Sequence, residues 1–196
     1  MRRVASQKRT DFAQRAAEIG FAFAELDGET YWDESARYEF TLREIEEDLE
    51  APTEELGALC REVAGKAVRD EAILRKLAIP QHAWDLIAES WKRGDKSLYG
   101  RFDFCYGGTG PAKLLEYNAD TPTSLYESAS FQWLWLEEQQ RLGMLSPDTD
   151  QFNAIHEALV TRWGEIAAPG TDVHFAADKE NPEDYATVEA LGWAAR

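Results

Sequence analysis

Residues 99–138 read YGRFDFCYGGTGPAKLLEYNADTPTSLYESASFQWLWLEE, and this stretch decides the fold that the sequence predicts. Small or apolar residues alternate with polar ones across residues 97–106, which is the period of a half-buried β-strand. Glycines and a proline then fill residues 107–111, and a second alternating run follows them. The pattern predicts a β-hairpin, because two amphipathic strands joined by a glycine-rich turn pair readily with each other.

Four polar side chains fall together on this predicted hairpin. Arg101 and Asp103 share one face of the first strand, and Glu116 and Asn118 share one face of the second. Two carboxylates and an amide carbonyl are the hard oxygen ligands that Mg²⁺ prefers when water and phosphate complete its shell. An arginine beside them suits a phosphoryl group. The alternative is a solvated face carrying a surface ion pair of little energetic worth.

Residues 119–124, ADTPTS, lead from the hairpin into an aromatic-rich segment for which we predict a helix. Thr121, Thr123 or Ser124 can cap that helix, and Pro122 fits its first turn. The free N–H groups and the positive dipole end at a helix start favour an anion. The segment therefore suits a substrate carboxylate or a phosphate.

Three motifs then carry a resemblance to a known family. RFDF at residues 101–104, LLEYNADTPTSLYE at 114–127 and FQWLWLE at 131–137 resemble the glutathionylspermidine synthase family, especially its shorter acid–amine ligase branch. The resemblance implies a partial ATP-grasp-like fold. It also implies an enzyme that joins a carboxylate to an amine through an acyl phosphate, with ATP and Mg²⁺ as cofactors.

The resemblance also implies roles for the residues of the hairpin. Arg101 matches the arginine that contacts the reacting carboxyl group or acyl phosphate, which gives it a catalytic role. The metal ligands of the family match Asp103, Glu116 and Asn118. The ligand set that the residue types suggest and the one that the resemblance implies are therefore the same.

The substrate-binding residues are also implied by the resemblance. The family binds its acid on a short hydroxyl-bearing loop, which corresponds here to Asp120, Thr121 and Thr123. Threonines stand where the best-known members have serines, so the identity of the acid stays open. A glutathione-like peptide is one candidate acid, and a polyamine is a candidate amine.

An acidic pair follows a short alternating run at residues 171–177, which predicts a strand. Pro182 then begins a predicted helix that has Glu183 and Asp184 in its first turn. Stabilisation by the helix dipole explains both acids without any function. The resemblance instead implies that they contact the amine. Both interpretations stay open.

The N-terminal half is predicted to be mainly helical. Thr41 and Glu44 form a T-x-x-E capping box that begins a helix, and Pro52 is expected to interrupt it. The next helix carries an apolar stripe across residues 56–68 that contains Cys60. We expect this stripe to be buried and the Cys60 thiol to pack in a core.

Composition limits the classes of function. The net charge of −16 disfavours nucleic acid and anionic membranes, whereas cationic amines suit it. The chain has no apolar segment that would serve as a signal peptide or cross a bilayer, so we expect a cytoplasmic protein without membrane partners. Its 196 residues suffice for one substantial domain or two small ones.

The combined prediction is an α+β fold, with a helix-rich N-terminal part packed on a mixed or antiparallel sheet. Residues 1–196 are expected to form a single truncated substrate-binding region, because the resemblance places the ATP-binding half further along a longer polypeptide. The chain alone is then expected to be inactive. The alternatives are an inactive fragment that retains substrate or Mg²⁺ binding, and a carboxylate–metal hydrolase. No histidine–carboxylate cluster supports the hydrolase. The oligomeric state stays open.

Overall fold

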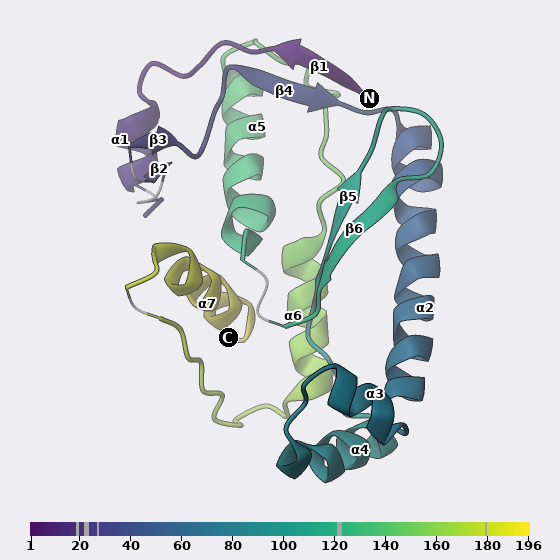
Figure 1. Cartoon of the computed structure of the whole chain (residues 1–196). Helices are drawn as coiled ribbons and strands as arrows, with labels where there is room; N and C mark the ends of the chain where they lie inside the picture. The colour runs from purple at the N-terminus through teal and green to yellow at the C-terminus, as the bar shows by residue number, and fades with distance from the viewer. Residues whose placement is uncertain (19, 22–23, 27, 121–122, 179) are drawn as a thin grey trace. The chain divides into compact units, whose positions relative to one another are not determined.

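The computed structural model describes residues 1–196 except for residues 19, 22–23, 27, 121–122 and 179. Helices predominate, and the strands among the described residues form three two-stranded sheets (Figure 1). The α+β class predicted from the sequence is therefore confirmed. No helix in the described part of the chain is both long and apolar enough to cross a membrane.

Contacts along the backbone divide the chain into two compact units. Unit 1 consists of Met1–Phe40, Leu98–Arg101 and Tyr117–Arg196. Unit 2 consists of Thr41–Ser97 and Phe102–Glu116. Each unit is described by itself below.

The N-terminal part of unit 1 contains short strands and one short helix. β1 (Arg2–Ala5) pairs antiparallel with β4 (Ala36–Glu39). Between them lie α1 (Phe12–Glu18) and the small antiparallel pair formed by β2 (Glu25–Leu26) and β3 (Glu29–Thr30). The residues that follow β3, up to Phe40, therefore also belong to unit 1.

The C-terminal part of unit 1 is helical. A π-helical segment, η3 (Glu127–Phe131), runs directly into α5 (Gln132–Arg141), and α6 (Ile155–Ile166) and α7 (Pro182–Ala194) follow. The helix predicted to begin at Pro182 is confirmed. The strand predicted over residues 171–177 is wrong, since these residues form neither strand nor helix. The alternation there was too short to specify a strand, and the structure gives this segment no partner strand among the described residues.

Aromatic packing forms the core of unit 1. Phe131 is fully buried; its ring stacks on Phe21 with centroids 4.0 Å apart and meets Trp32 edge to face at 4.6 Å. One cluster of buried residues consists of Ala16, Phe21, Tyr126 and Phe131. A second cluster consists of Leu125, Leu159, Ala190 and Ala194. The helix that follows the hairpin contributes to both clusters, so this core fixes where that helix begins.

Unit 2 contains a long helical run and shorter helices. The π-helical segment η1 (Glu44–Glu50) continues into α2 (Ala51–Ala67). The chain then forms α3 (Glu71–Lys76), the 3₁₀ turn η2 (Gln81–Ala83) and α4 (Trp84–Arg93). Most residues of the hairpin also belong to this unit.

The capping box at the start of this run is confirmed. The Thr41 N–H donates to Glu44 Oε2 at 2.8 Å, and the Glu44 N–H donates to Thr41 Oγ1 at 3.3 Å. The predicted interruption at Pro52 is wrong, because the chain stays helical through it. Pro52 lies in the first turn of α2, directly after the π-helical turns in which the Ala51 N–H bonds to Glu46 O, and a proline at that position has no N–H to satisfy.

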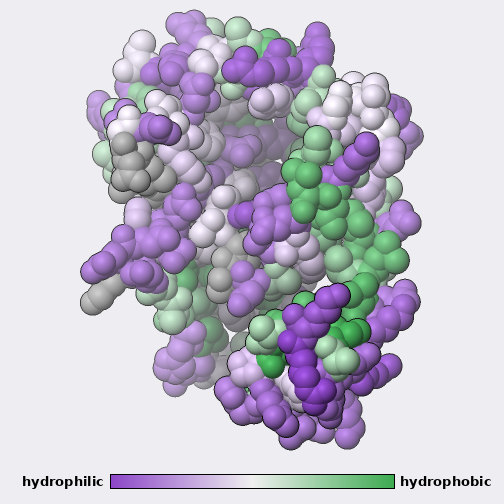
Figure 2. Space-filling model, viewed as in Figure 1, coloured by the Kyte–Doolittle hydropathy of each residue, from purple (hydrophilic) through white to green (hydrophobic). Residues whose placement is uncertain are grey.

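The apolar stripe of α2 is not buried as predicted. Leu59 and Val63 are 48% and 63% exposed, Gly65 is the buried residue of the helix, and Cys60 is half-buried. Figure 2 shows apolar side chains at the surface over α2. A periodic stripe predicts which face of a helix is apolar, but it does not specify what covers that face.

Candidate functional site

The predicted β-hairpin is present. β5 (Arg101–Cys105) pairs with β6 (Lys113–Asn118), and Gly108 and Gly110 in the connecting loop adopt positive φ angles of 88° and 69° (Figure 1). The rings of Phe102 and Phe104 lie 5.8 Å apart, so these side chains share a face. The alternation of a strand therefore places the two polar residues of the RFDF motif on the other face.

Within unit 2, the loop of the hairpin is fastened to the π-helical segment η1. The Ala112 N–H donates to the Asp48 carbonyl at 2.7 Å, and the Tyr106 hydroxyl donates to Asp48 Oδ2 at 2.6 Å. Desolvation, and after it the Asp48 carboxylate, raises the pKa of Tyr106 above its ordinary value. Tyr106 therefore stays a hydrogen-bond donor at neutral pH and holds the end of the hairpin in a fixed position.

Within unit 1, the open end of the hairpin is closely packed. A Cβ atom at Gly100 would lie 2.8 Å from the Tyr117 ring and 3.1 Å from the Asn118 carbonyl, so only glycine fits there without a shift. The start of β5 thus lies against the end of β6. Arg101 Nη1 donates to the Thr123 carbonyl at 3.1 Å. The guanidinium predicted to be catalytic therefore contacts the loop predicted to bind the acid.

The predicted metal ligands lie on the two paired strands. Arg101 and Asn118 are half-buried in unit 1, while Asp103 is half-buried and Glu116 exposed in unit 2. The donor chemistry of the set fits Mg²⁺, which takes few protein oxygens and keeps several waters. Among the described residues no three or more His, Cys, Asp or Glu side chains gather around a possible metal position. The predicted set contains two residues of those types and an asparagine, so it stays a prediction.

The predicted acid-binding loop is described in part. Thr121 lies outside the described residues, and Asp120 is exposed. Thr123 and Ser124 are half-buried, and Ser124 has a φ of 67°, in the left-handed region that a non-glycine residue seldom adopts. Ser128 Oγ donates to the Ser124 carbonyl at 2.6 Å. Hydrogen bonds from outside the loop therefore hold a strained backbone at its end.

A tyrosine–glutamate pair that no local sequence pattern indicates adjoins this loop, and it joins the 37% exposed Tyr31 to a buried Glu127. The Tyr31 hydroxyl donates to Glu127 Oε1 at 2.6 Å, and Glu127 is only 6% exposed. Desolvation raises the pKa of Tyr31 most, followed by the hydrogen bond and charge of Glu127; a hydrogen bond with Ser124 lowers it, and the charge of Glu183 raises it. Ser124 at the end of the loop and Glu183 at the start of α7 therefore both affect the pKa of the Tyr31 hydroxyl.

The predicted amine-binding pair lies in the first turn of α7. Asn181 Oδ1 caps this helix by accepting from the N–H groups of Glu183 at 3.0 Å and Asp184 at 3.4 Å. Both acidic side chains are half-buried. The cap and the dipole account for acids at this position. The role of Glu183 and Asp184 toward an amine stays a prediction.

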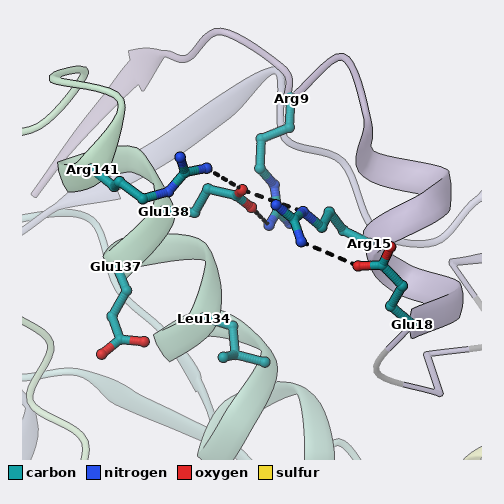
Figure 3. Close-up of a pocket in the computed structure, with 7 residues that line it drawn as sticks. All are labelled: Arg9, Arg15, Glu18, Leu134, Glu137, Glu138 and Arg141. Atoms are coloured by element: carbon teal, nitrogen blue, oxygen red, sulfur yellow. Dashed lines mark hydrogen bonds and ion pairs between the residues drawn. The ribbon is translucent and has the colours of Figure 1, made fainter.

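A cavity of about 290 Å³ lies elsewhere in unit 1 and is lined by Arg9, which precedes α1, by charged residues of α1 and α5, and by Leu134 of α5 (Figure 3). Arg9 extends into it with a side chain that is 3% exposed and pairs with Glu34 and Glu138, and the Arg9 hydrogen bond lowers the pKa of Glu138. Arg15 and Arg141 also pair with Glu138. Because the charges already compensate one another, this cluster joins the N-terminal segment to α5 and does not present a vacant charge to a ligand.

Comparison with known proteins identifies the family. The family model for the glutathionylspermidine synthase preATP-grasp region matches residues 3–196. The chain belongs to this family. A Haemophilus influenzae protein that bears the name acid–amine ligase is 38% identical over 189 residues, which cover 93% of this chain and 46% of that protein. The resemblance seen in the sequence motifs is therefore confirmed.

Two further members of the glutathionylspermidine synthase family are named as synthetases. Trypanothione synthetase from Crithidia fasciculata is 33% identical over 132 residues, covering 66% of this chain and 20% of that enzyme. The bifunctional glutathionylspermidine synthetase/amidase of Escherichia coli is 26% identical over 165 residues, covering 84% and 26%. The family is thus one of ligases, and this chain spans about half the length, or less, of these relatives.

Proposed function

We propose that this chain forms the acid-binding and metal-binding part of an ATP-dependent acid–amine ligase. The observation that carries the proposal is the 38% identity to the Haemophilus influenzae relative over a region that includes the whole hairpin. Support comes from the hydrogen bond between Arg101 and the Thr123 carbonyl, since it joins two residues with complementary proposed roles.

The side chains of the hairpin suit a phosphoryl transfer to a carboxylate. Asp103, Glu116 and Asn118 would hold Mg²⁺, which when bound neutralises charge on phosphate oxygens. Arg101 offers a fixed fork of N–H donors that matches a carboxylate or an acyl phosphate. These donors stabilise the charge that develops as the substrate carboxylate takes the γ-phosphoryl group of ATP.

The second step joins the amine. The attacking ammonium group first loses a proton to water; its neutral nitrogen then forms a C–N bond with the acyl carbon while the C–O bond to phosphate breaks, and the nitrogen releases a second proton to water. Glu183 and Asp184 would hold a cationic amine near the loop of Asp120, Thr121 and Thr123, which would hold the acid. The net charge of −16 favours a cationic substrate. The names of the Escherichia coli and Crithidia relatives suggest glutathione as the acid and a polyamine such as spermidine as the amine.

The test uses a chimera in which this chain replaces the matching residues of the Haemophilus influenzae relative. We expect ADP release that depends on Mg²⁺, glutathione and spermidine together. Arg101→Ala should lower kcat by at least about a hundredfold, because it removes a donor to the transition-state charge. The matched control is Arg93→Ala on α4, whose guanidinium pairs with the exposed Asp95. Equal turnover by the two variants would contradict the role of Arg101. Ligand binding without turnover would indicate a binding function instead.

A further inference from the structure

Tyr31 joins the segment after β3 to the segment that follows the hairpin in unit 1. Its hydroxyl donates to the buried Glu127 at 2.6 Å and hydrogen-bonds to the Ser124 side chain, and the Glu183 charge acts on it from α7. Ser124 directly follows the loop proposed to bind the acid, and Glu183 belongs to the pair proposed to bind the amine. Tyr31 and Glu127 lie 96 residues apart in the sequence, so spacing alone does not indicate their hydrogen bond.

Glu127 connects this hydroxyl to the loop. It is the first residue of the π-helical segment η3, three residues after Ser124. π-Helical turns are rare and occur preferentially at functional sites. Because the carboxylate is 6% exposed, it needs a donor within the protein, and the structure provides the Tyr31 hydroxyl. A displacement of Glu127 would therefore move the start of the helix, and with it the end of the loop.

The loop is held on its other side by the residue proposed to be catalytic. Arg101 donates to the Thr123 carbonyl at 3.1 Å, and Ser128 donates to the neighbouring Ser124 carbonyl at 2.6 Å. The left-handed conformation of Ser124 persists only where such contacts determine it. Thr123 and Ser124 thus lie between the Arg101 guanidinium and the Tyr31–Glu127 pair.

We infer that Tyr31 is a positioning residue that, through Glu127 and Ser124, fixes the acid-binding loop relative to Arg101. The inference rests on the proposed ligase function. It adds to that function a residue outside the motifs that carry the resemblance. Tyr31 does not touch the reacting atoms; it sets the geometry in which Thr123 and Arg101 receive the same carboxylate.

The first experiment measures hydrogen–deuterium exchange of residues 123–131 in the 196-residue chain, with no ligand. Tyr31→Phe removes only the hydroxyl, and we expect exchange in this segment to become faster. Glu127→Gln keeps a carbonyl that accepts from Tyr31, so we expect exchange close to that of the wild type. Tyr38→Phe is the matched control, because Tyr38 is 58% exposed on β4. Unchanged exchange in Tyr31→Phe would overturn the inference.

The second experiment measures binding of glutathione and of spermidine to the same variants by calorimetry. Tyr31→Phe should raise the Kd for glutathione by at least about tenfold and leave that for spermidine unchanged, whereas Glu127→Gln should leave both near the wild type. If Glu127→Gln instead weakens the binding of spermidine, Glu127 binds the amine through its charge and the inference is wrong. If Tyr31→Phe lowers only the melting temperature, its role is purely structural and the inference is also wrong.

The two experiments separate this inference from the proposed function. A wild-type chain that binds no glutathione, while Tyr31→Phe still accelerates exchange in residues 123–131, would contradict the proposed function and uphold the positioning of the loop. A wild-type chain that binds glutathione as tightly as Tyr31→Phe does would uphold the function and contradict the positioning.

Discussion

The two units of the chain are stabilised in different ways. Unit 1 contains both hydrophobic clusters found among the described residues, and long-range polar pairs such as Arg9–Glu138 and Tyr31–Glu127 supplement them. The buried apolar residues described in unit 2 are Ile45, Leu74 and Ala112. Its helices depend more on local features, among them the capping box at Thr41 and ion pairs within a single helix. Tertiary packing therefore specifies unit 1, whereas local sequence signals specify much of unit 2.

The largest expected effect is in the core of unit 1. Phe131→Ala removes a fully buried ring from the aromatic cluster and should lower the free energy of unfolding by about 3–5 kcal/mol. Val63→Ala on α2 of unit 2 removes a side chain that is 63% exposed and should change it by less than about 0.5 kcal/mol. Urea titration of both variants measures the difference. Similar losses would mean that α2 is covered in solution and that the contrast between the units is wrong.

The next effect concerns the buried ion pairs of unit 1. Arg9→Leu leaves Glu34 buried without its guanidinium partner and should cost about 3 kcal/mol. Lys66→Leu in unit 2 removes a lysine that is 70% exposed and pairs with the exposed Glu62, and it should cost far less. Melting temperatures of the two variants at neutral pH check this order. An equal decrease would show that the exposed pair is as important as the buried one.

Arg9 also makes the stability of the fold depend on pH. Arg9 holds the pKa of Glu138 below its ordinary value of 4.5. A carboxylate whose pKa is depressed in the folded state stabilises the fold above its unfolded pKa, and this contribution is lost as pH falls through the folded value. The wild type should therefore lose stability as pH falls below about 4.5, and Arg9→Leu should lose less over that range. A parallel decline in the two proteins would contradict the pairing of Arg9 with Glu138.

The smallest effect tests the local stabilisation of unit 2. Thr41→Ala removes the hydroxyl of the capping box and should cost about 1 kcal/mol, measured by urea titration. Thr41→Ser keeps the acceptor and serves as the control. A loss as large as that of Phe131→Ala would show that unit 2 depends on a single contact far more than this comparison allows.

Local signals in the sequence predicted several elements correctly. The hairpin, the capping box and the helix begun at Pro182 were all identified because each is specified by residues close together in the chain. The motifs of residues 101–137 also identified the family. These successes have the same physical basis, since turn residues, caps and alternation act over a few positions.

The failures concern features that depend on distant residues. Tyr31 and Glu127 lie 96 residues apart, so no local pattern could reveal their hydrogen bond. The exposure of Val63 depends on what packs against α2, which periodicity does not state. The helix that continues through Pro52 needed π-helical turns that composition does not indicate. Glu127 is the one signal that the sequence does offer. This acid follows the aromatic Tyr126 at the end of the motif of residues 114–127, within a segment predicted to be an ordinary helix.

We propose that oxygen ligands on the hairpin hold a divalent metal. The most direct measurement is a titration of the isotopically labelled chain with Mn²⁺, followed by paramagnetic broadening of its amide NMR signals. We expect substoichiometric Mn²⁺ to broaden residues 101–104 and 115–119 first and Mg²⁺ to compete. Asp103→Asn should abolish this broadening, whereas Asp95→Asn should not. Broadening that begins on the acidic helices, or that is unchanged in Asp103→Asn, would contradict the claim.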